Sequence, residues 1–515
     1  MEGTAKYRFR KESIRCAVMT IVCYLLVHGY RFMNKAFAGD ALLMVYQNDA
    51  AWQIALGRFV QPVLIMMRGS LESPLLIGLL TAFWLGAGAY LLADIFKIEK
   101  NVTMIFLALI LSANDAITAS NASFLPWTDF YGLAFFTAVL GVWMLQDAKW
   151  WHIVLAVLSF MFSMGVYQAY ICVAIGVSCI VFIFFLSKGM DVKKILKNVT
   201  VYAGSFLAAA GIYYGIWKIF QKVFNIWTAD TYNGLSGVGD YSDTSVGSLI
   251  LLTYKNVADY FINPPVFTTM VFRQQNLSRL WLVCLRGCNL LIFILFIAGF
   301  IMLISKYKPK ALNNICMLFI AAAFPFCINV VCFISKGMEH QLMTYAFGLC
   351  YLLVLLVYED ISEGIRWRKV LKICLLTLVG IVLWSKVVFA SQVYLKRDLQ
   401  DAQAQSMLTR IVYEIEKTDG YEAGVTPVAF CGTFENTSYT QPVDAMKDIV
   451  MWGMYGKTSM TYGGTEYAYL QLILNVNMNL TRIDDQDERV KAMPCYPSEG
   501  SVAPVDGVIV VKLSE

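Results

Sequence analysis

Charged residues are scarce in this sequence: Asp, Glu, Lys and Arg make up 15 % of its 515 residues, against about 25 % in a typical soluble domain. Histidine is rarer still, with three in the chain, and no CxxC or Cys/His spacing typical of a zinc site is present. The net charge of +5 forms no basic patch, which excludes a nucleic-acid partner. The composition therefore favours a membrane protein over several soluble domains.

Long apolar runs without any Asp, Glu, Lys or Arg recur along the chain, for example 73–93, 150–187 and 311–335. Because a helix needs about 20 apolar residues to cross the hydrocarbon core, we expect a mainly α-helical, polytopic membrane protein with about eleven transmembrane helices. The predicted crossings lie near 13–32, 74–96, 101–113, 129–145, 150–163, 170–187, 199–220, 281–304, 312–335, 341–358 and 373–390.

The distribution of Lys and Arg predicts the orientation of these helices. One set of connecting segments holds nineteen Lys and Arg in 55 residues, and these segments are 1–15, 97–100, 146–149, 188–198, 305–311 and 359–372. The other set holds seven in 125 residues, and it consists of 33–73, 114–128, 164–169, 221–278 and 336–340. Since cytoplasmic loops carry the excess of positive charge, we expect a multi-pass protein of the cell membrane with a cytoplasmic N-terminus. The long loops and the tail 391–515 then lie outside.

The tail differs in character from the rest of the chain. Residues 399–417 place apolar side chains on one helical stripe, and 426–434 and 507–513 are short apolar runs typical of buried strands. Further helical patterns occur near 443–451 and 466–478. We therefore predict two parts: a transmembrane domain over 1–395 and a small extracytoplasmic α/β domain over 396–515.

The first long outer loop, FAGDALLMVYQNDAAWQIALGRF, combines Asp40, Asp49 and Arg58 with an apolar, helix-compatible segment. Such a segment is suited to lie in the membrane interface. Asp40 and Arg58 would be about 27 Å apart in one continuous helix, so either the helix breaks or the two groups contact different parts of one long ligand. A loop of solvated charges without a functional role is the alternative.

Other polar residues gather at the same predicted side of the membrane. Asp115 ends the third crossing there, Asp129 begins the fourth, and Tyr167-Gln168 forms a tight turn. Tyr167 and Gln168 are either an interface anchor and a satisfied turn residue, or ligand contacts. The Gly- and Ser-rich loop 230–248 is either a mobile lid or a plain flexible connection. No ionisable residue lies at the centre of a predicted helix, which disfavours a proton-coupled transporter.

The order of these features resembles a known family. The Asp-bearing first outer loop that ends in Gly57-Arg58, the Tyr167-Gln168 turn and the tail PSEGSVAPVDGVIVVKLSE are similar to bacterial membrane glucosyltransferases of the glucosyltransferase II type, which decorate O-antigen and related surface polymers. The resemblance implies a GT-C-like architecture and transfer of a sugar, glucose, from a polyprenyl-phosphate carrier to a surface glycan outside the membrane. Where family members have paired acidic residues, this chain has Gly39-Asp40-Ala41, so Asp40 and Asp49 both stay open as the essential acid.

The implied reaction assigns roles to these residues. Asp40 or Asp49 is the catalytic base that takes the proton of the acceptor hydroxyl, and Arg58 binds the departing phosphate. We expect further substrate contacts from Asp115, Asp129, Tyr167 and Gln168, the last through a sugar hydroxyl. The lipid phosphate is already a leaving group, so we expect no cofactor and no dedicated metal. The alternatives are a transporter or flippase of lipid-linked sugars, which predicts broken helices, and a non-catalytic scaffold with a polymer-binding tail.

Overall fold

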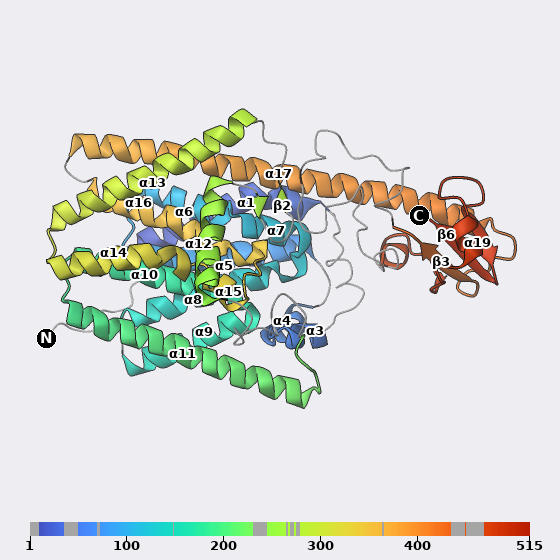
Figure 1. The fold of residues 1–515 in the computed structure, drawn as a ribbon, viewed down its shortest axis with the longest axis horizontal. Helices are drawn as coiled ribbons and strands as arrows, with labels where there is room; N and C mark the ends of the chain where they lie inside the picture. The colour runs from blue at the N-terminus through green and yellow to red at the C-terminus, as the bar shows by residue number, and fades with distance from the viewer. Residues whose placement is uncertain are drawn as a thin grey trace.

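The computed structural model describes residues 10–34, 50–69, 73–147, 149–229, 245–263, 266–267, 272–273, 279–362, 365–433, 449 and 468–514. These residues form a helical bundle, and a single long helix, α17 (Arg366–Glu416), leads from it into a small C-terminal domain (Figure 1). We call the end of the bundle that faces this domain the domain end, and the other end the opposite end. The predicted mainly helical fold with a small C-terminal sheet is confirmed.

The bundle is built from helices of very different lengths. In chain order these are α1 (Lys11–Met33), α3 (Ala50–Ala55), α4 (Val60–Arg68), α5 (Pro74–Ile95), α6 (Asn101–Ser112), α7 (Asp115–Ser123), α8 (Thr128–Leu145), α9 (Trp150–Val166), α10 (Ile171–Ser187), α11 (Val192–Val223), α12 (Val246–Ile262), α13 (Arg279–Tyr307), α14 (Ala311–Cys327), α15 (Val330–Ile334) and α16 (Leu349–Ile361). Short 3-10 turns connect some of them, namely η1 (Leu125–Trp127), η2 (Gln168–Tyr170), η4 (Gln341–Met343) and η5 (Tyr345–Gly348). After α12, two strands of two residues each, β1 (Val266–Phe267) and β2 (Phe272–Arg273), pair in antiparallel fashion.

Among the described residues, seven helices are long and apolar enough to cross a membrane. An eighth is added if α6 and α7, which meet at a 44° bend, form one span. Each predicted crossing contains a helix, but α9 and α14 have 17 residues and α16 has 13, and at 1.5 Å per residue these are shorter than a hydrocarbon core of about 30 Å. The long apolar helices support the prediction of a membrane protein, and the number of eleven transmembrane helices stays a prediction.

The bend between α6 and α7 has a local cause. Asn114 has extended backbone angles and its side chain accepts a hydrogen bond from the Ala116 N–H at 3.0 Å, so it caps a new helix. In the third predicted crossing the chain therefore ends one helix at Ser112 and starts another at Asp115. Asp115 lies in the first turn of α7, where the helix dipole favours a negative charge.

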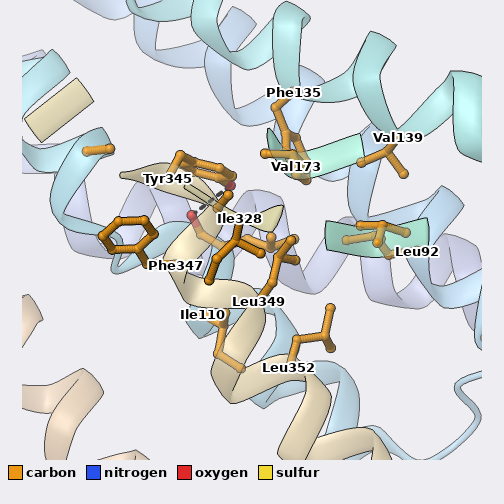
Figure 2. Packing of buried hydrophobic residues seen from close by; sticks show 14 of the residues in the cluster. Leu92, Ile110, Phe135, Val139, Val173, Ile328, Tyr345, Phe347, Leu349 and Leu352 are labelled. Carbon is orange, nitrogen blue, oxygen red and sulfur yellow. Dashed lines mark hydrogen bonds between the residues drawn. The ribbon is translucent and has the colours of Figure 1, made fainter. Parts of the chain in front are cut away.

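The core of the bundle is apolar and closely packed. Figure 2 shows part of it, where α6, α8, α10 and α16 contribute Ile110, Val139, Val173 and Leu352 to one buried cluster. Around this core, α1 and α5 pack along each other, α5 packs on α8, and α8 packs on α9. The packing of this core positions the helices. Those of their ends that lie at the domain end carry the polar residues of the candidate site.

The C-terminal domain has a four-stranded sheet in the order β4-β3-β6-β5. Its strands are β3 (Pro427–Cys431), β4 (Asn479–Leu480), β5 (Val502–Val505) and β6 (Val508–Lys512), with β3 parallel to β4 and β6 and β5 antiparallel to β6. The helical elements beside it are η7 (Tyr469–Ile473) and α19 (Glu488–Ala492). The two strands predicted within 426–434 and 507–513 are confirmed, whereas the helical pattern at 443–451 lies outside the described residues except for Ile449.

The helix predicted at 399–417 is part of α17, which continues without a break from the last predicted crossing. Its apolar stripe, including Met407, Leu408 and Ile411, is buried against the C-terminal domain. The predicted domain boundary at residue 395 thus falls inside a helix, and the division into 1–395 and 396–515 stays a prediction about independent units.

Candidate functional site

Arg58 stands in a tight turn between α3 and α4, at the domain end of the bundle (Figure 1). Its backbone N–H donates to the Gln53 carbonyl oxygen at 2.8 Å, which closes the turn. The preceding Gly57 has φ +79°, and a Cβ there would lie 2.2 Å from the Tyr213 hydroxyl oxygen and 2.7 Å from Gln168 Nε2. Only glycine combines this backbone conformation with so little space.

Gln168 fixes this turn from η2. Its Nε2 donates to the Leu56 carbonyl oxygen at 2.7 Å and to the Tyr213 hydroxyl at 2.8 Å. Both N–H groups of the amide therefore have protein acceptors, and the carbonyl oxygen of this side chain is the part left for a ligand. The predicted contact to a sugar hydroxyl is restricted to that oxygen.

Tyr167 lies under the side chain of Arg58, with the guanidinium carbon 4.7 Å from the centre of the tyrosine ring. Tyr167 is buried and belongs to a group of tyrosines, with its ring centre 5.0 Å from that of Tyr131. In the same group, Tyr170 stacks on Tyr131 at 6.3 Å and lies tilted against Tyr345 at 5.4 Å. The face of an aromatic ring attracts a cation electrostatically, and this attraction does not use the N–H groups of the guanidinium as hydrogen-bond donors. The two predicted residues Arg58 and Tyr167 are thus brought together.

His340 comes close to Arg58 from the connection between α15 and η4. Its ring meets Phe124 edge-on at 5.4 Å, and its Nδ1 accepts a hydrogen bond from the Leu342 N–H at 3.2 Å. Burial and, after it, the positive charge of Arg58 lower the pKa of His340 to about 3. The imidazole is therefore neutral at physiological pH and adds no positive charge beside Arg58.

Glu339, the neighbour of His340, is a buried carboxyl group that is 5 % exposed. Its Oε2 accepts hydrogen bonds from Asn256 Nδ2 at 2.6 Å and from Asn329 Nδ2 at 3.5 Å. Burial raises the pKa of Glu339 to about 7, although these hydrogen bonds work in the opposite direction. The carboxyl group of Glu339 therefore titrates near neutral pH.

Asp129 forms a buried ion pair with Arg68 at the end of α4. Arg68 also donates to the Pro126 carbonyl oxygen at 2.7 Å, and its guanidinium carbon lies 4.5 Å from the centre of the Phe130 ring. The pair fastens α4 to the start of α8. Asp129 was predicted to bind substrate, and here its charge is balanced by an arginine that the sequence analysis did not single out.

Asp115 likewise has a cationic partner, Lys386 of α17. Lys386 donates a second hydrogen bond to the Tyr260 hydroxyl at 2.8 Å, and its ammonium lies 4.5 Å from the centre of that ring. The group joins α7, α12 and α17. A lysine alone in the apolar run 373–390 was a signal for a buried anionic partner, because an unpaired charge at that depth is costly.

Two more arginines lie fully buried at the domain end, and sequence reasoning missed both. Arg31 donates from Nε to the Asn121 carbonyl oxygen at 2.9 Å, and Arg397 donates to Ser123 Oγ at 3.1 Å. Both acceptors lie in the last turn of α7. Arg31 is the penultimate residue of the predicted crossing 13–32, and Arg397 follows the crossing 373–390 by seven residues, so an interface anchor is the usual interpretation of both.

The predicted base candidates Asp40 and Asp49 lie outside the described residues, as does most of the proposed lid 230–248. Within the part of the chain that the structure describes, no three His, Cys, Asp or Glu side chains gather as metal ligands. The expectation of a reaction without metal or cofactor stays a prediction.

The opposite end of the bundle is organised differently, around two acidic residues at the end of α16. Glu359 pairs with Lys372 of α17 and with Lys100, just before α6, at 3.0 Å. Asp360 pairs with Lys306 of α13 at 2.8 Å. These pairs tie the end of α16 to α17, α13 and the start of α6.

Together these features define a polytopic helical membrane protein whose polar and aromatic side chains gather at the domain end. The chain belongs to the glucosyl transferase GtrII family, whose model matches residues 29–358, more than half of the sequence. The match ends within α16, so it contains the Arg58 turn, the tyrosine group and the paired aspartates Asp115 and Asp129, and it leaves out α17 and the C-terminal domain. Family membership implies glycosyltransferase activity. No curated protein and no solved structure matched the chain.

Proposed function

We propose that this protein transfers a sugar, glucose, from a polyprenyl-phosphate carrier to a cell-surface glycan on the outer face of the membrane. Membership of the glucosyl transferase family supports the transfer of a sugar. The observation that carries the lipid-phosphate donor is Arg58, a guanidinium held over Tyr167 at 4.7 Å beside a neutral histidine, at one end of a membrane bundle. A phosphate needs a cation of this kind, since guanidinium can donate two parallel hydrogen bonds to it.

The orientation rests on the distribution of positive charge. The nineteen Lys and Arg of the segments assigned to the cytoplasm include Lys100, Lys306 and Lys372, which lie at the opposite end of the bundle. The domain end is then outside, together with the Arg58 turn and the C-terminal domain. No nucleotide is needed there, because the energy of transfer is already stored in the sugar–phosphate bond of the donor.

In the proposed reaction the oxygen of an acceptor hydroxyl forms a bond to the anomeric carbon, and the bond from that carbon to the phosphate oxygen breaks. The hydroxyl proton passes to a carboxylate, for which Asp40 is our first candidate and Asp49 the second. General base catalysis of this kind contributes about 10²–10⁴-fold. The electron pair of the broken bond stays on the polyprenyl phosphate, and Arg58 stabilises the added negative charge.

The other predicted contacts have narrower roles in this proposal. Tyr167 supports Arg58 from below, and Gln168 offers its carbonyl oxygen to the sugar. Asp115 and Asp129, each paired with a cation, act as walls of the site in this proposal, and Asp115, with 15 % of its side chain exposed, is the better placed of the two to contact a sugar hydroxyl.

A transporter of lipid-linked sugars is the second candidate, because the broken span α6–α7 is a feature that such proteins share. The ion pairs of Glu359 and Asp360 count against a passage through the opposite end. The two functions differ in their products: transfer yields a glucosylated acceptor, whereas transport yields only a donor that has changed sides.

The test uses the full-length protein in lipid nanodiscs, synthetic polyprenyl-phosphate glucose carrying a radiolabel, and envelope glycan from the expression host as acceptor. We expect label in the glycan, a loss of about a hundredfold in Arg58→Ala, and a loss mainly of turnover in Arg58→Lys, since lysine offers a point charge in place of a fork. Lys218→Ala is the matched control, because Lys218 is another cation near the end of α11 that donates to Gln221 at 2.9 Å. Absence of labelled glycan together with movement of the donor between leaflets would favour the transporter.

A further inference from the structure

Helix α11 holds the Arg58 turn, although most of this helix faces away from the bundle. Its most apolar stretch is 17 % buried, the lowest value among the seven candidate spans. Leu207 and Ile219, for example, are 74 % and 60 % exposed. In a membrane such a surface faces lipid, so α11 is the wall between the bilayer and the site.

Two residues on the inner face of α11 make the contact, Tyr213 and Trp217, one helical turn apart. The Tyr213 hydroxyl donates to the Gly57 carbonyl oxygen at 3.1 Å, and Trp217 Nε1 donates to the Ile54 carbonyl oxygen at 2.6 Å. The Tyr213 ring also stacks on Phe59 with 5.7 Å between ring centres.

These contacts bracket Arg58 on both sides in the sequence. The carbonyl groups of residues 54 and 57 are bound on one side, and the ring of Phe59 is packed on the other. The glycine before Arg58 leaves no room for a Cβ between the turn and Tyr213. The contacts with α11 therefore determine where the backbone of Arg58 lies.

We propose that Tyr213 and Trp217 are positioning residues for the phosphate of the lipid-linked donor: they fix the Arg58 guanidinium at the lipid-facing wall of the site. The inference rests on the proposed function, and it adds the residues on which the geometry of Arg58 depends. Because they act through Arg58, their effect on donor binding must vanish when the guanidinium is removed.

A double-mutant cycle tests this dependence. The measured quantity is the dissociation constant of synthetic polyprenyl-phosphate glucose for the full-length protein in nanodiscs, which needs no acceptor. We expect Tyr213→Phe, which keeps the ring and removes the hydroxyl, to weaken binding about tenfold. Trp217→Phe should act in the same direction. In the Arg58→Ala background we expect Tyr213→Phe to change binding less than about twofold.

Tyr214→Phe is the matched control, because Tyr214 is the next residue on α11, is 56 % exposed and loses the same hydroxyl, while its edge-on ring contact with Trp217, at 6.1 Å between ring centres, is kept by phenylalanine. It should leave binding unchanged. If Tyr213→Phe and Trp217→Phe weaken donor binding equally with and without Arg58, or do not weaken it at all, the positioning role is wrong while the function of Arg58 stands. If Arg58→Ala itself leaves donor binding unchanged, the donor role of Arg58 and this inference fail together.

Discussion

Removing one partner of the Arg68–Asp129 ion pair should destabilise the protein much more than removing both. The exposed fractions of the two side chains are 7 % and 4 %, so water cannot replace a lost partner. Breaking a buried pair costs about 3–5 kcal/mol, whereas replacing both ions by neutral groups of similar volume is often close to neutral. We expect Arg68→Met and Asp129→Asn each to lower the free energy of unfolding by about 3 kcal/mol, and the double variant to recover most of that loss.

The assay is unfolding in mixed micelles with increasing SDS, followed by tryptophan fluorescence, for the wild type, both single variants and the double variant. The expected coupling between the two positions is about 2 kcal/mol or more. If the two single effects add within about 0.5 kcal/mol, the two charges do not stabilise each other and the reasoning is refuted.

The same four proteins separate two roles of Asp129. If Asp129 only fastens α4 to α8, the double variant should regain sugar transfer along with stability. If Asp129 also binds substrate, as its position in the sequence suggested, the double variant should be stable and still impaired in transfer.

Two further predictions concern carboxyl groups. Asp40→Asn should lower transfer by about a hundredfold or more without loss of folded protein, and near-normal transfer in this variant combined with a loss in Asp49→Asn would move the base to Asp49. For Glu339, burial raises the pKa from 4.5 to about 7, so the unfolded chain releases this proton at lower pH than the folded protein. Stability should therefore fall as pH rises from about 4.5 to about 7 and then level off. In Glu339→Gln, the free energy of unfolding measured between about pH 4.5 and 7 should not show this decrease. A pH profile identical to that of the wild type would contradict the raised pKa of Glu339.

Features that follow from local pattern were predictable from the sequence. The apolar runs gave the positions of the helices, and the strands around Phe430 and Val510 were visible as short apolar runs bounded by Gly or Pro. Arg58 was singled out because a charge followed an apolar segment, and the structure places it over Tyr167, a second residue chosen from the sequence.

The pairing of charges was not predictable, because the partners are far apart in the chain. Arg68 and Asp129 are separated by 61 residues, and Asp115 and Lys386 by 271. Nothing in a local window relates such positions, and the packing of the bundle alone brings them together. From the sequence alone the two aspartates were therefore predicted to bind substrate, whereas in the structure each pairs with a cation.

The break between α6 and α7 could have been predicted, and its charges bear on the choice between transferase and transporter. Asn114 followed by Asp115 is a typical helix start, with a capping side chain and an acid in the first turn. In transporters, the ends of broken helices point their dipoles at the cargo. In α7 the ends are occupied by the protein itself: Asp115 lies at the positive N-terminal end and pairs with Lys386, while Arg31 and Arg397 donate to groups in the last turn, at the negative end. A helix end that already lies against charged groups of the protein is a poorer site for an ion or an anionic cargo. The bend of α7 is therefore better explained as a rigid wall of the domain-end site than as a moving part of a transport path.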